Sequence, residues 1–458
     1  MLGKERAGEI FGKLRRYASA DEIEVLFYGT RNALTRFANN VIHQNMAEEN
    51  VVISVRTAFG QRTARATTNK LDDDSLRRVV QASESLARVQ HPDPDLLAMP
   101  LASDAGKSVC ARRYFEQTAN VTPEQRAETV KRIVAVAEKH KLNCAGIFSS
   151  AEWEEGIFNS RGIEGWHTQT SSEISITMLG ADSSGWQKAN SPDVEQLDAE
   201  GLAETAAQKT LDSAGPREIP AGKYTVILEP AAVLDIVGFM FYDFGGLAVL
   251  DQRSFLNNRV GTQVFGGNIN IWDDVDHPLQ SGATFDGEGI RRQRVQLVEK
   301  GVVKRLVYAR ATAARMQNSE HKDNVGRIEP TGHGFPLPNE MGEAPMNIVF
   351  ESESNTSVGE MIASTERGVL VTRLWYIREV DPYEKILTGM TRDGTFYVEN
   401  GKLQGGVRNF RFNESLIHML SNVEAMGTPV RASGEESFDM VVPAMKVKDF
   451  NFTEVTKF

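Results

Sequence analysis

The sequence predicts an α+β fold, in which N-terminal α/β sandwich units of strand meanders with helices precede a large, mainly antiparallel β domain. Three observations predict it. In the first half of the chain, short alternating apolar runs typical of strands are followed by helices with clear start signals. From Gly222 onward, strand patterns dominate. The 458 residues are too many for one compact core, and about 150 residues per domain predict two or three domains. We place these domains at residues 1–105, 106–218 and 219–458.

The first unit is predicted to begin with a helix, in which Ile10, Leu14 and Tyr17 recur at helical spacing. Four strands are expected next, in EVLFYG, LTRFANNVIHQN, NVVISVRTAF and QRTARATT. The stretch DDDSLRRVVQASESLARV then predicts a helix, because aspartates in its first turn complement the helix dipole. The proline-containing stretch QHPDPDLLAMPLASDAGKS is predicted to be a linker.

The second unit is predicted to open with a capped helix. Thr122 can cap it, Pro123 suits the first helical position and Gln125 completes a capping box before ETVKRIVAVAEKH. Strands are expected in NCAGIFSSA, GIFNSRG and SSEISITML, and a second helix over residues 194–213. Both N-terminal units therefore share the order of strand meander and then helix.

The last unit is predicted to be rich in strands. KYTVILEP reads as a strand entering a helix, and RVQLVEKGVVKRLVYA as two strands joined at Lys300-Gly301. GTFYVENGKLQGGV predicts a hairpin, because Asn400-Gly401 is the strongest short signal for a two-residue turn. We expect a helix over residues 413–422 and a final strand in AMKVKDFNFT.

The composition excludes several classes of protein. Apolar residues make up 41% and charged residues 25%, as in ordinary globular domains. The net charge of −11 argues against nucleic acid and anionic lipid as partners, since both are negatively charged. Two cysteines, Cys110 and Cys144, are too few for a disulfide framework and suit a reducing compartment. Neither a secretory signal nor a run of about 18 apolar residues is recognisable, so we expect a cytoplasmic protein without membrane spans.

A set of collinear motifs resembles one known family. The set is TRFANNVIHQN, LDQRSFLNNRVGTQVF, NIWDDVDHP, ATFDGEGIRRQRVQLVEKGVVKRLVYAR, RIEPTGHG, GVLVTRLWYI and TRDGTFYVENGKLQGGVRNFRFNESL. In this order the motifs resemble the TldD/PmbA family, also called peptidase U62 or the modulator of DNA gyrase family. The resemblance extends from about residue 20 to the last strand, and it is closest to the TldE/PmbA branch.

The zinc motif of the TldD branch is degenerate in this chain. That branch carries His-Glu-x-x-x-His, whose histidines bind zinc and whose glutamate acts on the zinc-bound water. Aligned through the Val-Gly pair, these positions become Leu234, Asp235 and Phe239. Apolar side chains cannot bind a divalent cation, and the family's cysteine ligand has no counterpart after Cys144. We therefore predict no catalytic, metal-binding or cofactor-binding residue in this chain, and a buried helix at the old motif.

Other candidate residues are weaker. His333 lies in the glycine- and proline-rich stretch EPTGHGFPLPN, and with Asp235 it is a weak candidate for substrate contact. The cluster in WDDVDHP could hold a cation through oxygen ligands, but aspartates that cap backbone amides in a loop are the favoured interpretation. Glu414 and His418 are spaced to share a helix face, most simply as a surface pair. His43 is expected to have a structural role. The cluster comprises Asp273, Asp274, Asp276 and His277.

The resemblance implies a partner subunit rather than a complete enzyme. We expect this chain to shape the substrate cleft for unfolded peptides and to stabilise a TldD-like, zinc-bearing partner, in a heterodimer or a higher oligomer. Whether the chain is catalytic by itself is left open. One alternative is a self-sufficient peptidase or homodimeric hydrolase with a non-standard site. Another is a non-enzymatic scaffold or a binding protein that modulates gyrase.

Overall fold

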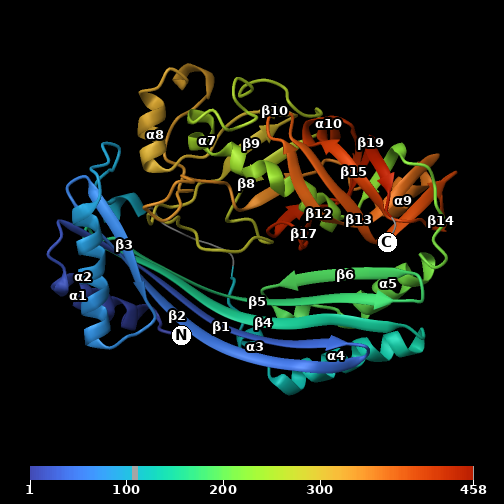
Figure 1. Cartoon of the computed structure of the whole chain (residues 1–458), viewed down its shortest axis with the longest axis horizontal. Coiled ribbons are helices and arrows are strands. Elements are labelled where there is room, and N and C mark those ends of the chain that lie inside the picture. The colour runs from blue at the N-terminus through green and yellow to red at the C-terminus, as the bar shows by residue number, and fades with distance from the viewer. Residues whose placement is uncertain (106–111, 457–458) are drawn as a thin grey trace.

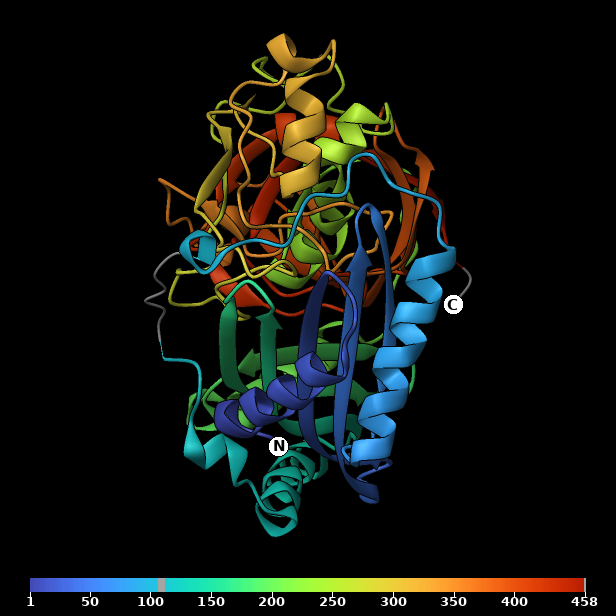
Figure 2. The ribbon, with the colours of Figure 1, turned by 90° about the vertical axis from the view of Figure 1, so that its left-hand side faces the viewer.

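The computed structural model describes residues 1–105 and 112–456 (Figure 1), so Cys110 and the end of the predicted linker lie outside the described residues. The fold is α+β, as predicted. Its N-terminal part is a long antiparallel sheet lined by helices, and its C-terminal part is a β-rich body that lies above this sheet in Figures 1 and 2. No helix within the described ranges is long and apolar enough to cross a membrane.

The N-terminal sheet has the strand order β3-β2-β1-β4-β5-β6. Strands β1 and β4 pair along most of their length, so the strands of both predicted N-terminal units form one sheet. The bounds are β1 Glu22–Ala38, β2 Val41–Phe59, β3 Arg62–Thr68, β4 Asn143–Asn159, β5 Glu164–Leu179 and β6 Ser184–Ser191.

Four long helices cover one face of this sheet and form two separate hydrophobic cores with it. Helices α1 and α2 pack on Val25, Phe27 and their neighbours, whereas α4 and α5 pack on Phe148 and Ile174. The other face is turned toward the C-terminal body (Figure 1). The helices are α1 Lys4–Tyr17, α2 Asp73–Val89, α4 Pro123–Lys139 and α5 Ala199–Asp212, with the short α3 Glu116–Ala119, η1 Ala102–Ala105 and η2 Val194–Gln196 between them.

Local capping chemistry and turn chemistry account for several of these bounds. The predicted capping box is present, because Thr122 accepts from the Gln125 amide while the Gln125 side chain accepts from the Thr122 amide. The expectation of one strand through LTRFANNVIHQN is wrong. Asn39 and Asn40 both have positive φ, at 49° and 61°, and form the two-residue turn between β1 and β2.

The C-terminal body contains two further sheets. One has the order β10-β9-β8-β11-β18-β17. In the other, β12 pairs with both β7 and β13, so that β7, β19, β15, β13 and β12 close into a ring. The only parallel pairs between named strands of the described chain are β7–β12 and β11–β18, so the body is mainly antiparallel, as predicted. The strands are β7 Gly222–Leu228, β8 Asn270–Asp273, β9 Val295–Glu299, β10 Val302–Val303, β11 Ile348–Glu351, β12 Arg367–Asp381, β13 Ile386–Glu399, β14 Lys402–Gly406, β15 Phe410–Ser415, β16 Val423–Met426, β17 Val430–Ala432, β18 Met440–Val442 and β19 Met445–Val455.

Both predicted hairpins of the C-terminal body are present. Lys300-Gly301 joins β9 to β10, and Asn400-Gly401 joins β13 to β14, each with two consecutive positive φ angles. The helix predicted over residues 413–422 is shorter, because its first residues belong to β15 and Ser415 caps it. The helical segments are α6 Pro230–Val237, η3 Gly238–Phe244, α7 Gly246–Leu250, α8 Arg310–Gln317, η4 Lys322–Asn324, α9 Val358–Ala363 and α10 Leu416–Ser421.

Candidate functional site

The degenerate motif lies on α6, which follows β7 as the sequence predicts. Pro230 occupies the first turn, and the residues from Ala232 to Val237 are all buried in the core of the C-terminal body. Leu234 is fully buried in that core, and Phe239 is partly buried against it. The helix is thus enclosed on nearly every side, which suits its nearly uniform apolar composition.

Asp235 serves as a clamp for the loop at residues 434–436. Its Oδ1 accepts hydrogen bonds from the backbone amides of Glu435 at 3.0 Å and Glu436 at 2.9 Å. Gly434 lies so close that a side chain there would collide with Asp235 and Leu234. Burial raises the pKa of Asp235 to about 7, against the two amide hydrogen bonds, which lower it. With no exposed surface, Asp235 has a structural contact here, and its contact with substrate stays a prediction.

These residues do not fit the zinc site that the family resemblance would place on this helix. Two of the three motif positions are apolar, and the one carboxylate already accepts two backbone amides. Among residues 1–105 and 112–456, no group of three or more His, Cys, Asp or Glu side chains is arranged to hold a metal ion.

His333 is fully buried beside Asp273. Its Nε2 lies 3.0 Å from Asp273 Oδ1, and its Nδ1 lies 2.9 Å from the hydroxyl of Thr331. The other oxygen of Asp273 accepts the backbone amides of Met346 and Asn347. Burial acts to raise the pKa of Asp273, but His333, Arg292 and the Asn347 amide together outweigh it, and the pKa is lowered. In this structure His333 links its loop to the end of β8, so its predicted contact with substrate also stays a prediction.

The other weak candidates have separate partners. Asp274 pairs with Arg294 and Asp276 with Arg291, so the carboxylates of WDDVDHP do not converge. Glu414 and His418 do form a pair, with 2.7 Å between Glu414 Oε1 and His418 Nδ1. The idea that they share a helix face is wrong, because Glu414 belongs to β15 and only His418 lies in α10. His277 is partly buried, and His43 lies on an exposed stretch of β2.

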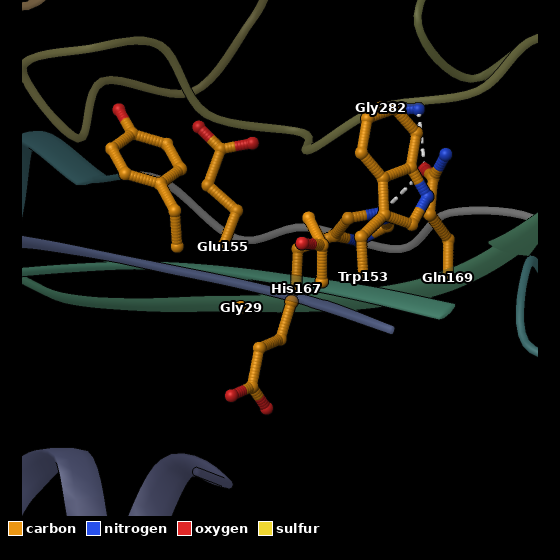
Figure 3. Close-up of a pocket in the computed structure, with 9 residues that line it drawn as sticks. Gly29, Trp153, Glu155, His167, Gln169 and Gly282 are labelled. Atoms are coloured by element: carbon orange, nitrogen blue, oxygen red, sulfur yellow. Dashed lines mark hydrogen bonds between the residues drawn. The ribbon is translucent and has the colours of Figure 1, made fainter. Parts of the chain in front are cut away.

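A cavity that the sequence did not predict lies on the face of the N-terminal sheet that is turned toward the C-terminal body. It has a volume of about 150 Å³. The central side chain is Glu155 of β4, directly opposite Tyr28 of β1 on one side and His167 of β5 on the other. Figure 3 shows Glu155 and Trp153 extending from the sheet toward the segment that carries Gly282. The lining residues are Tyr28, Gly29, Thr30, Trp153, Glu154, Glu155, His167, Gln169 and Gly282.

The ionisable groups of this cavity are shifted by burial. Burial raises the pKa of Glu155, and Arg292 opposes that effect. Burial, followed by the charge of Glu155, raises the pKa of Tyr28 to about 12. Burial also lowers the pKa of His167, which therefore favours the neutral ring. Three titratable groups with shifted pKa values in one cavity are typical of binding sites and catalytic sites.

The sequence did not predict this cavity, because the predicted strands left a gap at the residues of β4 that form its centre. We predicted separate strands in NCAGIFSSA and GIFNSRG, whereas β4 runs without a break from Asn143 to Asn159 through the acidic stretch EWEE. The pairing that places Tyr28 opposite Glu155 is set by sheet register between residues more than 120 positions apart, whereas His167 reaches Glu155 from the next strand along the chain. Only the alternation of side chains along β4 could have indicated that Trp153 and Glu155 share a face.

Comparison with known proteins matches most of the chain to one group. Family models for PmbA/TldA metallopeptidases match residues 23–87 as domain 1, 116–214 as the central domain and 221–454 as the C-terminal domain. Metalloprotease PmbA from Escherichia coli O157:H7 is 22% identical over 423 residues, which cover 87% of each chain. A metalloprotease PmbA homolog from Haemophilus influenzae is 21% identical over 86% of this chain and 85% of its own. The crystal structure of TldE from Thermococcus kodakarensis has the same fold, with a TM-score of 0.85 at 18% identity, over 98% of this chain and 100% of that one.

Proposed function

The chain belongs to the PmbA/TldA metallopeptidase family, and we propose that it is a TldE/PmbA-like subunit without zinc, which works with a zinc-bearing TldD-like subunit in a cytoplasmic peptidase for unfolded peptides. The observation that carries the proposal is the set of side chains at the degenerate motif, on and directly after α6. The family resemblance aligns Leu234 and Phe239 with the zinc-binding histidines of the TldD branch, and Asp235 is occupied by the loop at residues 434–436. This helix contributes packing rather than a Lewis acid, which supports a partner as the source of the hydrolytic chemistry.

The loop held by Asp235 also supports a structural role, because it connects the two parts of the chain. Glu435 pairs with Lys188 of β6, which also pairs with Glu173 of β5. Glu436 accepts the backbone amide of Tyr376 in β12. A loop fixed from α6, β6 and β12 at once keeps the N-terminal sheet and the C-terminal body in a defined relation, as a subunit that shapes a shared cleft requires.

A free strand edge offers a place for the partner. Residues 41–50 of β2 are all exposed, and β3 pairs with β2 only from Ile53 onward. Across the described residues, β2 therefore has no strand on its outer side along this stretch. Unpaired strand edges bind other chains by adding a strand, and exposed Val41, Ile42 and Met46 add apolar surface here. We propose this edge as the surface for the TldD-like subunit.

The test is to measure zinc and peptidase activity for the purified chain alone, for a TldD-like subunit alone, and for their mixture. We expect no stoichiometric zinc and no peptide cleavage with this chain alone. In the mixture we expect zinc, a complex in size-exclusion chromatography and faster cleavage of an unfolded peptide than with the TldD-like subunit alone. Stoichiometric zinc in the isolated chain, or zinc-independent cleavage by it, would refute the proposal and favour a self-sufficient hydrolase.

A further inference from the structure

We propose that the cavity on the inner face of the N-terminal sheet, formed by β1, β4 and β5, binds the positively charged side chain of a lysine or arginine in an extended peptide. Nothing in the degenerate motif or in the family comparison assigns this cavity a ligand. The proposal rests on the proposed function only for the source of the cation, a peptide. The recognition itself follows from the chemistry of the cavity wall.

The carboxylate of Glu155 is the first requirement for such a site. Among the described residues it accepts no hydrogen bond and has no cation within 4 Å, and it is partly buried; the charge of Arg292 acts on it only from a greater distance. The adjacent Glu154 points to the opposite face of the sheet, where it accepts the backbone amides of Leu2 and Gly3. Glu155 is therefore the one lining carboxylate of the described cavity that lacks a partner. An enclosed carboxylate without a partner is unfavourable, and an entering cation relieves that cost.

Aromatic side chains supply the second requirement. Tyr28 lies directly across from Glu155 on β1, and Trp153 precedes Glu155 by two residues on the same face of β4. Side chains directly opposite in a sheet have Cβ atoms about 4.5–5.5 Å apart, close enough to share one ligand. Trp153 is 44% exposed although it borders a cavity, so its ring is available to a ligand. The faces of tryptophan and tyrosine attract ammonium and guanidinium groups, and a neighbouring carboxylate completes the charge match.

His167 does not oppose a cation. The Gln169 Oε1 accepts the Gly282 amide at 2.7 Å and lies 2.8 Å from His167 Nε2. Because that oxygen can only accept, Nε2 must carry the proton and donate to it. Burial lowers the pKa of His167, so the ring is neutral and adds no positive charge to the cavity. The same hydrogen bonds fix the Gly282 segment of the C-terminal body over the sheet, which gives the cavity its second wall (Figure 3).

The volume decides what size of group enters. At about 150 Å³ the cavity is smaller than the ~300 Å³ or more of pockets for whole small molecules. An engineered cavity of about 150 Å³ in another protein accepts benzene, which is similar in bulk to one long side chain. One lysine or arginine side chain therefore fits, while its peptide backbone stays outside along the sheet.

The experiment measures binding of labelled peptides to the isolated, full-length chain by fluorescence anisotropy. The probe is an unstructured, N-terminally acetylated and C-terminally amidated peptide whose only charge is one lysine, and the comparison peptide has norleucine at that position. We expect the lysine peptide to bind at least about tenfold tighter, the factor that corresponds to ~1.4 kcal/mol. Glu155→Gln should abolish this preference, and an arginine version of the peptide should behave like the lysine version.

Glu164→Gln is the matched control, because it removes one negative charge from an exposed position on the same sheet. It should keep the preference for lysine, which separates recognition in the cavity from general attraction to an acidic protein. An unchanged melting temperature of Glu155→Gln confirms that the variant is folded. Equal affinity for the two peptides, or an undiminished preference in folded Glu155→Gln, overturns the proposal. The assay contains no zinc and no partner subunit, so a negative result leaves the subunit proposal unaffected. Zinc in the isolated chain, in turn, would refute only the subunit proposal.

Discussion

Replacing Asp235 by asparagine tests whether this residue is a buried loop clamp. The amide oxygen of Asn can accept the same two backbone amides, at Glu435 and Glu436, but it carries no charge at any pH. The wild-type carboxyl, by contrast, must either stay protonated or ionise inside the core. The variant should therefore keep the loop in place while removing the pH dependence that Asp235 gives to stability.

The sign follows from the pKa of Asp235, which burial raises from 3.8 to about 7 in the folded state. Between these two pH values the unfolded chain has lost the proton while the folded chain still binds it, so the stability of the wild type falls as the pH rises. At 1.36 kcal/mol per pH unit, the full loss is on the order of 4 kcal/mol above pH 7. About 2.5 kcal/mol of that loss falls between pH 5 and pH 8.

The assay is urea unfolding of wild type and Asp235→Asn at pH 5 and pH 8, followed by tryptophan fluorescence. The stability of the variant relative to wild type should rise by about 2.5 kcal/mol from pH 5 to pH 8. Asp323→Asn, at an exposed aspartate, should show no such change. Asp235→Ala should be less stable than Asp235→Asn at both pH values by about 1–3 kcal/mol, because the two backbone amides lose their acceptor. If wild type and Asp235→Asn keep a constant difference across this range, Asp235 is not a buried, titrating clamp.

Three further substitutions test other parts of the structure. Met46→Lys, on the free edge of β2, should weaken complex formation with a TldD-like subunit in size-exclusion chromatography, whereas Val89→Lys on the exposed end of α2 should not; equal weakening by both would remove the edge from the interface. His333→Ala should destabilise the chain by about 3–5 kcal/mol in urea unfolding, because Asp273 loses its buried partner, and a loss below about 1 kcal/mol would show that the pair is not needed. Leu234→Ala should cost about 2–5 kcal/mol, and a near-neutral effect would contradict its place in the core.

The parts of the fold that the sequence predicts correctly depend on local chemistry. The capping box of Thr122 and Gln125 and the turns at Lys300-Gly301 and Asn400-Gly401 each involve residues within a few positions of one another. The turn at Asn39-Asn40 was missed although its chemistry is also local, because the apolar residues on both sides suggested one continuous strand. Asparagine tolerates positive φ better than most residues, so Asn39-Asn40 can form this turn, but the pair is a weaker turn signal than Asn-Gly.

The parts that the sequence does not predict depend on register between distant segments. The closed ring of the C-terminal body requires β12 to pair with β7 in parallel and with β13 in antiparallel orientation, and no local pattern specifies such a choice. The cavity around Glu155 is assembled in the same way, from β1, β4 and β5. The candidates that sequence alone suggested, Asp235 and His333, are by contrast buried and bonded within the core. Asp235 and His333 stand out in the sequence and make structural contacts in the core, whereas Glu155 and Tyr28, which line the cavity, did not stand out in the sequence.

This distribution has a physical reason. A helix that binds zinc must keep polar ligands and an open coordination position beside the cleft, which limits how tightly it packs. With apolar Leu234 and Phe239 at the positions that the resemblance aligns with zinc ligands, α6 packs onto the core, and Asp235 binds the loop at residues 434–436. Glu435 of that loop forms an ion pair with Lys188 of β6 in the N-terminal sheet. Strands β1, β4 and β5 of the same sheet form the cavity of Glu155. In this chain α6 therefore holds, through Asp235, a loop that contacts both the C-terminal body and the N-terminal sheet.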